Sequence, residues 1–146
     1  NVQVGDTVTI STKLIPDLKG VPAAIAGGPA LIQNGKPFAD REPPDGASVA
    51  YSERSKYERH PRSAVGWNAQ KLFLITVDGR QPGLSVGMTL AELAEYMVTK
   101  LKCTDGMNFD GGASSALWMG GIVNDPCQGE RAVANSLVIY RKADAP

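Results

Sequence analysis

The chain has 146 residues and a mass of 15.4 kDa, with 15 Lys and Arg, 15 Asp and Glu and one His, so its formal net charge is zero. Zero net charge excludes the strong, uniform phosphate attraction of a typical nucleic-acid-binding protein. An apolar content of 42% with 21% charged residues is typical of a folded domain, which we expect over residues 1–146. The longest apolar run, residues 72–77, is well below the roughly 18 residues of a membrane span, and residues 1–20 lack a signal-peptide pattern.

The first third of the chain predicts short strands separated by turns. Apolar stretches around residues 8–10 and 21–25 are strand-like. Residues 30–33 and 36–38 predict a hairpin, because Asn34-Gly35 between them supplies the positive φ angles of a type I′ turn. Residues 39–62 are polar and predict an exposed loop.

The remainder predicts further strands and one clear helix. Residues 63–67 and 71–78 predict a second hairpin, and the almost continuous apolar pattern of its later strand predicts that this strand is covered on both faces. A helix is expected at about residues 89–102, where Thr89 and Glu92 form a capping-box pattern. Together these elements predict an α+β (mixed α/β) fold with an antiparallel-rich sheet. Further short strands are expected at residues 106–109, 115–119 and 133–141.

The number of cysteines gives an indication of the cellular compartment. Cys103 and Cys127, with a single His, are too few for a structural zinc site within the chain. The two thiols are either joined in a disulfide or separately buried. An even number of cysteines in a glycine-rich chain favours the disulfide, and with it an oxidising compartment. We therefore expect a secreted or otherwise extracytoplasmic protein.

Three acidic turns are candidate functional positions. Asp78, Asp110 and Glu130 each lie at the end of a predicted strand, where loops converge on a site. Asp-Gly is also the commonest turn dipeptide, so each could be a turn and nothing more. The region around Asp110 is the strongest candidate for a binding site, because a glycine pair lets the backbone approach a ligand closely and serines supply hydroxyl groups. The candidate binding residues there are Asn108, Gly111, Gly112, Ser114 and Ser115.

Three arginines suggest an anionic substrate. Arg62, Arg80 and Arg131 flank the acidic turns, and a guanidinium group presents a planar fork that suits phosphate or carboxylate oxygens. The alternative is that Arg80 pairs with Asp78 and Arg131 with Glu130 in simple salt bridges.

Other chemistries fit the sequence less well. A serine hydrolase would need a G-x-S-x-G elbow, which the Ser114 region lacks, and its base would have to be His60, which we expect to be solvated. A phosphate-binding P-loop is absent. Asp110 with Asn108 and Asp105 could hold a divalent cation through oxygen ligands, although the calcium-loop spacing is not met in full. A divalent cation therefore stays an alternative, and no cofactor is required.

Several segments taken in order resemble the phosphodiester glycosidase family. The match runs over about residues 22–141 and is most specific in D-G-R-Q-P-G followed by N-x-D-G-G-x-S-S. Two positions depart from the family pattern, since Ala113 stands where Gly is usual and Ala116 where Thr is common. The segments that carry the resemblance are residues 27–35, 60–66, 77–89, 92–94, 108–115 and 130–135.

The resemblance implies hydrolysis of a sugar-1-phosphodiester, with a sugar similar to N-acetylglucosamine. A phosphate leaves as a stable anion, so anion stabilisation should matter more than a general acid. On this hypothesis Arg62, Arg80 and Arg131 hold the phosphate. Asp110 is the base or nucleophile, assisted by Asp78 or Glu130.

The resemblance also implies a missing part. The family domain begins earlier, with an Asn-Gly-Gly-aromatic-Phe type motif that this chain lacks. We therefore expect an N-terminal fragment of the same precursor as a partner that completes the sheet and the site. Two other functions stay open: a non-catalytic glycan-binding module of a secreted or cell-surface assembly, and a cytosolic interaction domain with two reduced cysteines. The sequence predicts no nucleic-acid partner and leaves the oligomeric state open.

Overall fold

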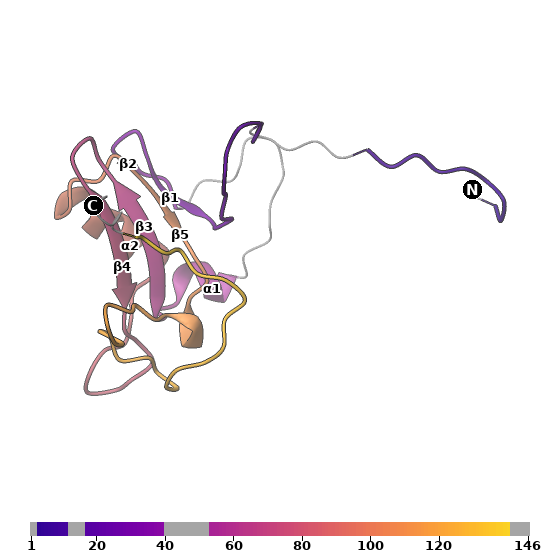
Figure 1. The fold of residues 1–146 in the computed structure, drawn as a ribbon. Coiled ribbons are helices and arrows are strands. Elements are labelled where there is room, and N and C mark those ends of the chain that lie inside the picture. The colour runs from indigo at the N-terminus through magenta and orange to yellow at the C-terminus, as the bar shows by residue number, and fades with distance from the viewer. Residues whose placement is uncertain (1–2, 12–16, 40–52, 141–146) are drawn as a thin grey trace, which may run out of the picture.

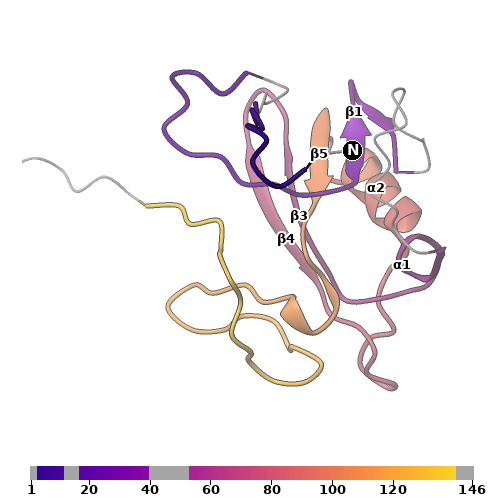
Figure 2. The same cartoon turned by 90° about the vertical axis from the view of Figure 1, so that its right-hand side faces the viewer.

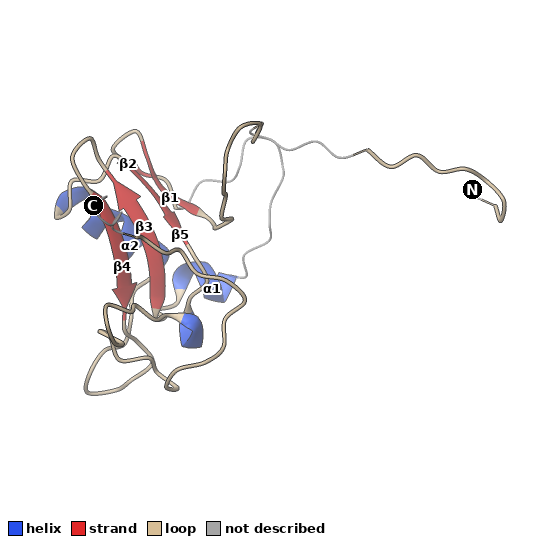
Figure 3. Cartoon of the chain, viewed as in Figure 1, coloured by secondary structure: helices blue, strands red, loops and turns tan. Residues whose placement is uncertain are grey.

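A computed structural model describes residues 3–11, 17–39 and 53–140 (Figure 1). Five strands form one sheet in the order β2-β1-β5-β3-β4, and every pairing is antiparallel. The α+β fold with an antiparallel-rich sheet and one main helix is therefore confirmed (Figure 3). The strands are β1 (Ala30–Gln33), β2 (Lys36–Pro37), β3 (Arg62–Trp67), β4 (Leu72–Val77) and β5 (Asp105–Asn108), and the helices are α1 (Glu53–Tyr57) and α2 (Leu90–Thr99).

Both predicted hairpins form. Asn34 and Gly35 between β1 and β2 have φ angles of 52° and 72°, as a type I′ turn requires. In the β3–β4 hairpin, the Asn68 side-chain oxygen accepts hydrogen bonds from the backbone N–H groups of Gln70 and Lys71 at 3.0 and 2.9 Å. This Asn-centred turn sets the register in which Trp67 pairs with Leu72.

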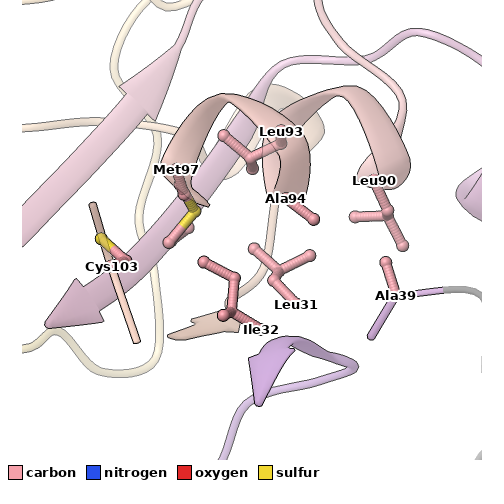
Figure 4. Close-up of a cluster of buried hydrophobic side chains, with 9 residues drawn as sticks. Leu31, Ile32, Ala39, Leu90, Leu93, Ala94, Met97 and Cys103 are labelled. Carbon is pink, nitrogen blue, oxygen red and sulfur yellow. The ribbon is translucent and has the colours of Figure 1, made fainter. Parts of the chain in front are cut away.

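Helix α2 begins at the predicted capping box, in which the Thr89 hydroxyl accepts from the Glu92 N–H and the Glu92 carboxylate accepts from the Thr89 N–H. The helix buries one face on the sheet (Figure 4). It can lie close because Gly66 and Gly106, opposite each other in β3 and β5, leave room for Met97. A Cβ atom at these two glycines would lie 2.5 and 2.7 Å from Met97 Cε.

The two faces of the sheet are covered differently. Helices α1 and α2 lie on one side, while residues 112–140, irregular apart from one 3₁₀ turn at Gly112–Ser114, lie away from them (Figure 2). No helix of the described residues is long and apolar enough to cross a membrane. The buried core under α2 comprises Leu31, Ile32, Ala39, Ala64, Leu90, Leu93, Ala94, Met97 and Cys103.

Several predicted strands are wrong. Residues 8–10, 21–25, 115–119 and 133–140 belong to no strand in the structure, and residue 141 lies outside the described residues. An alternating or apolar pattern favours a strand, but the strand forms only when a neighbour supplies hydrogen bonds. In these regions only an isolated antiparallel bridge, Trp118 to Ile122, is present.

Two further expectations need correction. The region 39–62 is not simply a loop, because α1 lies within it; residues 40–52 fall outside the described part. Strand β4 is not fully covered on both faces, because Leu72 is 53% exposed and the other five residues are half-buried; it is also an outer strand of the sheet.

The expected disulfide is also wrong. Cys103 and Cys127 are both free thiols. Cys103 belongs to the core beneath α2, where a Cβ atom at Gly66 would lie 2.9 Å from its sulfur, whereas Cys127 belongs to the irregular chain after residue 112. Burial raises the pKa of the Cys103 thiol, which keeps it protonated and unreactive.

Thiol labelling tests this arrangement. In the native protein without reductant, we expect Cys127, which is half-buried, to react with a thiol reagent at least tenfold faster than Cys103, which is buried and has the raised pKa. After unfolding, both should react at similar rates, as peptide mass spectrometry of the labelled sites would show. Failure of both thiols to react in the unfolded, unreduced protein would instead demonstrate a disulfide.

Candidate functional site

The centre of the site is a close packing of four sequence segments around Pro61. Pro61 is fully buried. A Cβ atom at Gly79 would lie 2.7 Å from the Pro61 nitrogen, and one at Gly111 would lie 2.8 Å from the Pro61 carbonyl oxygen. A Cβ atom at Gly87 would collide with the His60 carbonyl group. Only glycine permits these approaches, so the segments at residues 60–62, 78–80, 87–89 and 110–112 meet at one point.

Backbone hydrogen bonds also hold these segments together around Pro61. The Gly112 N–H donates to the Pro61 carbonyl oxygen at 2.9 Å, which places the 3₁₀ turn Gly112–Ser114 beside β3. His60 and Met88 exchange backbone hydrogen bonds of 3.2 and 3.1 Å. The start of α2 and the loop after β5 are thereby tied to the residues that precede β3.

Asp78 holds a loop in place. Its carboxylate accepts from Asn124 Nδ2 at 2.9 Å and from the Asp125 N–H at 3.1 Å. Asn124 also accepts from the Leu117 N–H and donates to the Ser115 carbonyl oxygen. Asp78 therefore acts through Asn124 to connect the end of β4 to the chain after Ser115. Sequence reasoning missed Asn124, because no local motif marks it.

Arg62 lies inside the fold. Its side chain donates to the backbone carbonyl oxygens of Met88, Ser55 and Glu58 at 2.8, 2.9 and 3.0 Å, and the residue is 5% exposed. Burial, followed by the neighbouring Arg80, lowers the pKa of Arg62. The geometry thus commits this guanidinium to α1 and to the start of α2, and it gives no support to direct phosphate contact.

Arg80 packs against the loop after β5. A Cβ atom at Gly112 would lie 3.1 Å from an Arg80 guanidinium nitrogen, so the guanidinium rests on this glycine. Arg80 also donates to His60 Nδ1 at 3.4 Å. His60 is not the solvated side chain expected from sequence, because its side chain is only 15% exposed. Neither Arg80–Asp78 nor Arg131–Glu130 is an ion pair among the described residues.

A cavity of about 410 Å³ lies between the sheet and the irregular chain, a size suited to a small ligand. Asp110, Ser114 and Arg131 line it, together with Ser63 and Thr76, which pair across β3 and β4. Asp110, Arg131 and Glu130 are exposed, and Glu130 is not part of the lining.

Asn108 and Ser115 are buried and do not line the cavity. Asn108 donates to the carbonyl oxygens of Gly28 and Phe109 at 2.9 and 2.7 Å, while its Oδ1 and the Ser115 hydroxyl have no hydrogen-bond partner among the described residues. The described residues hold no group of three His, Cys, Asp or Glu side chains that could bind a metal ion. Asp105 instead accepts from the Asn34 N–H, at the other end of β5 from Asp110.

Comparison with known proteins identifies the family. A family model described as phosphodiester glycosidase matches residues 1–140. The chain belongs to the phosphodiester glycosidase family. A search of curated proteins found no match. The family assignment agrees with the resemblance carried by the motifs around Pro61 and Asp110.

Solved structures with the same fold include a zebrafish N-acetylglucosamine-1-phosphodiester alpha-N-acetylglucosaminidase catalytic domain, auto-inhibited by its pro-peptide (23% identity, TM-score 0.53, 70% of this chain and 34% of that one). A hypothetical protein from Synechocystis is also similar (24% identity, TM-score 0.52, 68% and 17%). This chain therefore spans about a sixth of the length of the Synechocystis structure and about a third of the zebrafish one.

Glycine substitutions test the packing around Pro61. Gly79→Ala should lower the free energy of unfolding by about 1–3 kcal/mol, because the new Cβ meets backbone atoms that cannot move aside. The matched control is Gly121→Ala, where a Cβ would have no atom within 4 Å, and its effect should stay within about 0.5 kcal/mol. Urea unfolding measures both, and equal effects would contradict the close packing.

Proposed function

We propose that this chain carries part of the active site of an enzyme that hydrolyses a sugar-1-phosphodiester with an N-acetylglucosamine-like sugar. The supporting observation is the cavity lined by Asp110, Ser114 and Arg131 in a member of the phosphodiester glycosidase family. The zebrafish relative is named for cleavage of an N-acetylglucosamine-1-phosphodiester.

The proposed chemistry breaks the bond between the sugar C1 and the phosphate oxygen. The phosphate departs as an anion, so cationic groups that stabilise it count for more than a general acid. Arg131 and Arg80 are assigned to the phosphate, and Ser114 supports them. Asp110 either takes the proton of the attacking water or attacks C1 itself, with Glu130 as a candidate for assistance.

Arg62 and Asp78 have structural roles in this proposal. Arg62 Nε and Nη2 are already bound to three carbonyl oxygens, and both Asp78 carboxylate oxygens accept hydrogen bonds from the backbone N–H of Asp125. In this proposal both side chains keep these hydrogen bonds throughout the reaction. The proposal includes an extracytoplasmic location. This location rests on the family resemblance alone, because the two cysteines are free thiols and therefore give no support for an oxidising compartment.

Asp110→Asn tests the central assignment. In a preparation that cleaves a sugar-1-phosphodiester, the substitution should lower kcat by about a hundredfold or more, because the amide neither accepts the proton nor attacks C1. Release of free sugar measures the rate. The matched control is Asp105→Asn, at the opposite end of β5, which keeps an acceptor for the Asn34 N–H and should retain the wild-type rate. Undiminished cleavage by Asp110→Asn would refute the role.

Binding measurements distinguish the alternative function. A glycan-binding module would bind the same phosphodiester in calorimetry without releasing sugar. Release of sugar that depends on Asp110 supports the enzyme, and binding without release by the completed domain supports the module.

We also propose that the rest of the family domain adds a strand to β4. The two outer strands of the sheet differ: β2 carries Lys36 and Pro37, which discourage pairing, whereas β4 has neither a charge nor a proline. An apolar groove of about 500 Å³ lies beside β4, lined also by Leu93 and Leu117. An extended apolar segment supplied by an N-terminal fragment of the same precursor fits this edge.

Hydrogen exchange tests the strand addition. The chain is expressed alone and together with the polypeptide encoded immediately before it, and amide exchange is compared. The outward-facing amides of β4 should slow by tenfold or more in the complex, because they gain hydrogen-bond partners, while the amides of β2 at the other edge stay unchanged. Co-purification without protection of β4 would contradict the proposal.

A further inference from the structure

The single histidine of the chain lies between a candidate phosphate-binding arginine and helix α1. His60 Nδ1 lies 3.4 Å from Arg80 Nε and 3.3 Å from a second Arg80 nitrogen. On the other side of the ring, His60 Nε2 lies 3.1 Å from the Arg54 carbonyl oxygen. The side chain is 15% exposed, so the ring has little freedom to turn.

These contacts select one tautomer. A guanidinium group has only donors, so Nδ1 beside Arg80 must present its lone pair. The Arg54 carbonyl oxygen is only an acceptor, so Nε2 must carry the hydrogen. Both contacts are satisfied together only by a neutral imidazole with its hydrogen on Nε2.

The surrounding charges favour the neutral form. Burial is the largest cause that lowers the pKa of His60, and the positive charges of Arg80 and Arg62 lower it further. The Arg54 carbonyl oxygen and the carboxylate of Glu58, 3.7 Å from Nε2, act in the opposite direction. The balance leaves the pKa below its usual 6.5, so the imidazole is uncharged at neutral pH.

Arg80 has an unusual backbone that makes its placement specific. Its φ angle is 57°, a left-handed conformation that costs a residue with a Cβ about 1 kcal/mol or more. The guanidinium that this conformation directs toward Gly112 is held on its other side by His60. A guanidinium group that is already held by two contacts loses little conformational entropy when it binds an anion.

We propose that His60 is a positioning residue whose neutral imidazole holds the Arg80 guanidinium against the turn at Gly112, and that protonation of His60 releases Arg80. A protonated ring has no lone pair for Arg80 and places a like charge within 3.4 Å of it. The proposal rests on the proposed function only in assigning Arg80 to the phosphate. Phosphodiester affinity should then be constant at pH 7–8 and fall as the pH drops through the pKa of His60.

The stability of the folded state also decreases as the pH falls. The folded state binds the His60 proton less readily than the unfolded state, so the contribution of this group to stability is lost as the pH falls below 6.5 toward the folded-state pKa.

Nuclear magnetic resonance of the one imidazole tests the geometry without any assay of activity. Nitrogen-15 correlation spectra should show the Nε2–H tautomer and a pKa below 6.5, and Arg80→Gln should raise that pKa measurably. Arg131→Gln is the matched control, since Arg131 is no cause of the shift. An Nδ1–H tautomer, or a pKa that Arg80→Gln leaves unchanged, would overturn the proposal even if the protein cleaves phosphodiesters.

Binding variants test the consequence at the site. The probe is the methyl phosphodiester of N-acetylglucosamine, whose charge is constant between pH 5 and 8, measured by calorimetry on the completed domain. His60→Asn keeps an acceptor oxygen near the position of Nδ1, so it should retain affinity within about threefold and lose the pH dependence. His60→Leu removes the acceptor and should weaken binding about tenfold at pH 7.5.

The positioning role of His60 and the proposed function are contradicted by different results. A His60→Asn variant that keeps the wild-type pH profile would overturn the positioning role. If no variant and no wild-type protein binds the probe at any pH, the proposed function fails, while the tautomer and the Arg80-dependent pKa still decide how His60 and Arg80 interact.

Discussion

The approach of backbone to backbone at Pro61 is the constraint on which the rest of the site depends. Gly79, Gly87 and Gly111 each bring a different segment to within a distance that excludes a side chain. A Cβ at any one of them would push apart the end of β4, the start of α2 or the loop after β5. The glycine excess of the composition is therefore concentrated, in part, where four segments must share one small volume.

Polar groups then fix what the glycines bring together. Asp78 ties the end of β4 to the chain at Asn124, and Arg62 ties β3 to α1 and to the start of α2. Both are charge-assisted hydrogen bonds to groups that would otherwise need water, which makes them stronger than neutral ones. Two residues that look functional by type therefore bind other segments of this chain: Asp78 binds the segment at Asn124 and Asp125, and Arg62 binds the region of α1 and the start of α2.

The parts of the fold that could be predicted from sequence are those with local causes. The Asn34-Gly35 hairpin and the capping box of α2 follow from the chemistry of a few adjacent residues, and both form as expected. The strand expected at residues 133–140 failed because it depends on a distant partner, which no local pattern reveals. The contact of Arg62 with Met88 and that of His60 with Arg80 were missed for the same reason, since these partners lie 26 and 20 positions away along the chain. The assignment of Asp110 and Arg131 to catalysis stays a prediction.

The burial of Arg62 does not remove it from the electrostatics of the site. A guanidinium group stays charged at neutral pH even where burial lowers its pKa. Its Nε and Nη2 donate to carbonyl oxygens, yet its charge acts through protein rather than water, where screening is weaker and the field reaches further. Burial and then the charge of Arg80 lower the pKa of His60 most, the charge of Arg62 lowers it further, and a neutral His60 leaves Nδ1 free to accept from Arg80. The buried arginine thus favours the arrangement of the exposed one, and the formally neutral chain gathers positive charge at the place where an anion is proposed to bind.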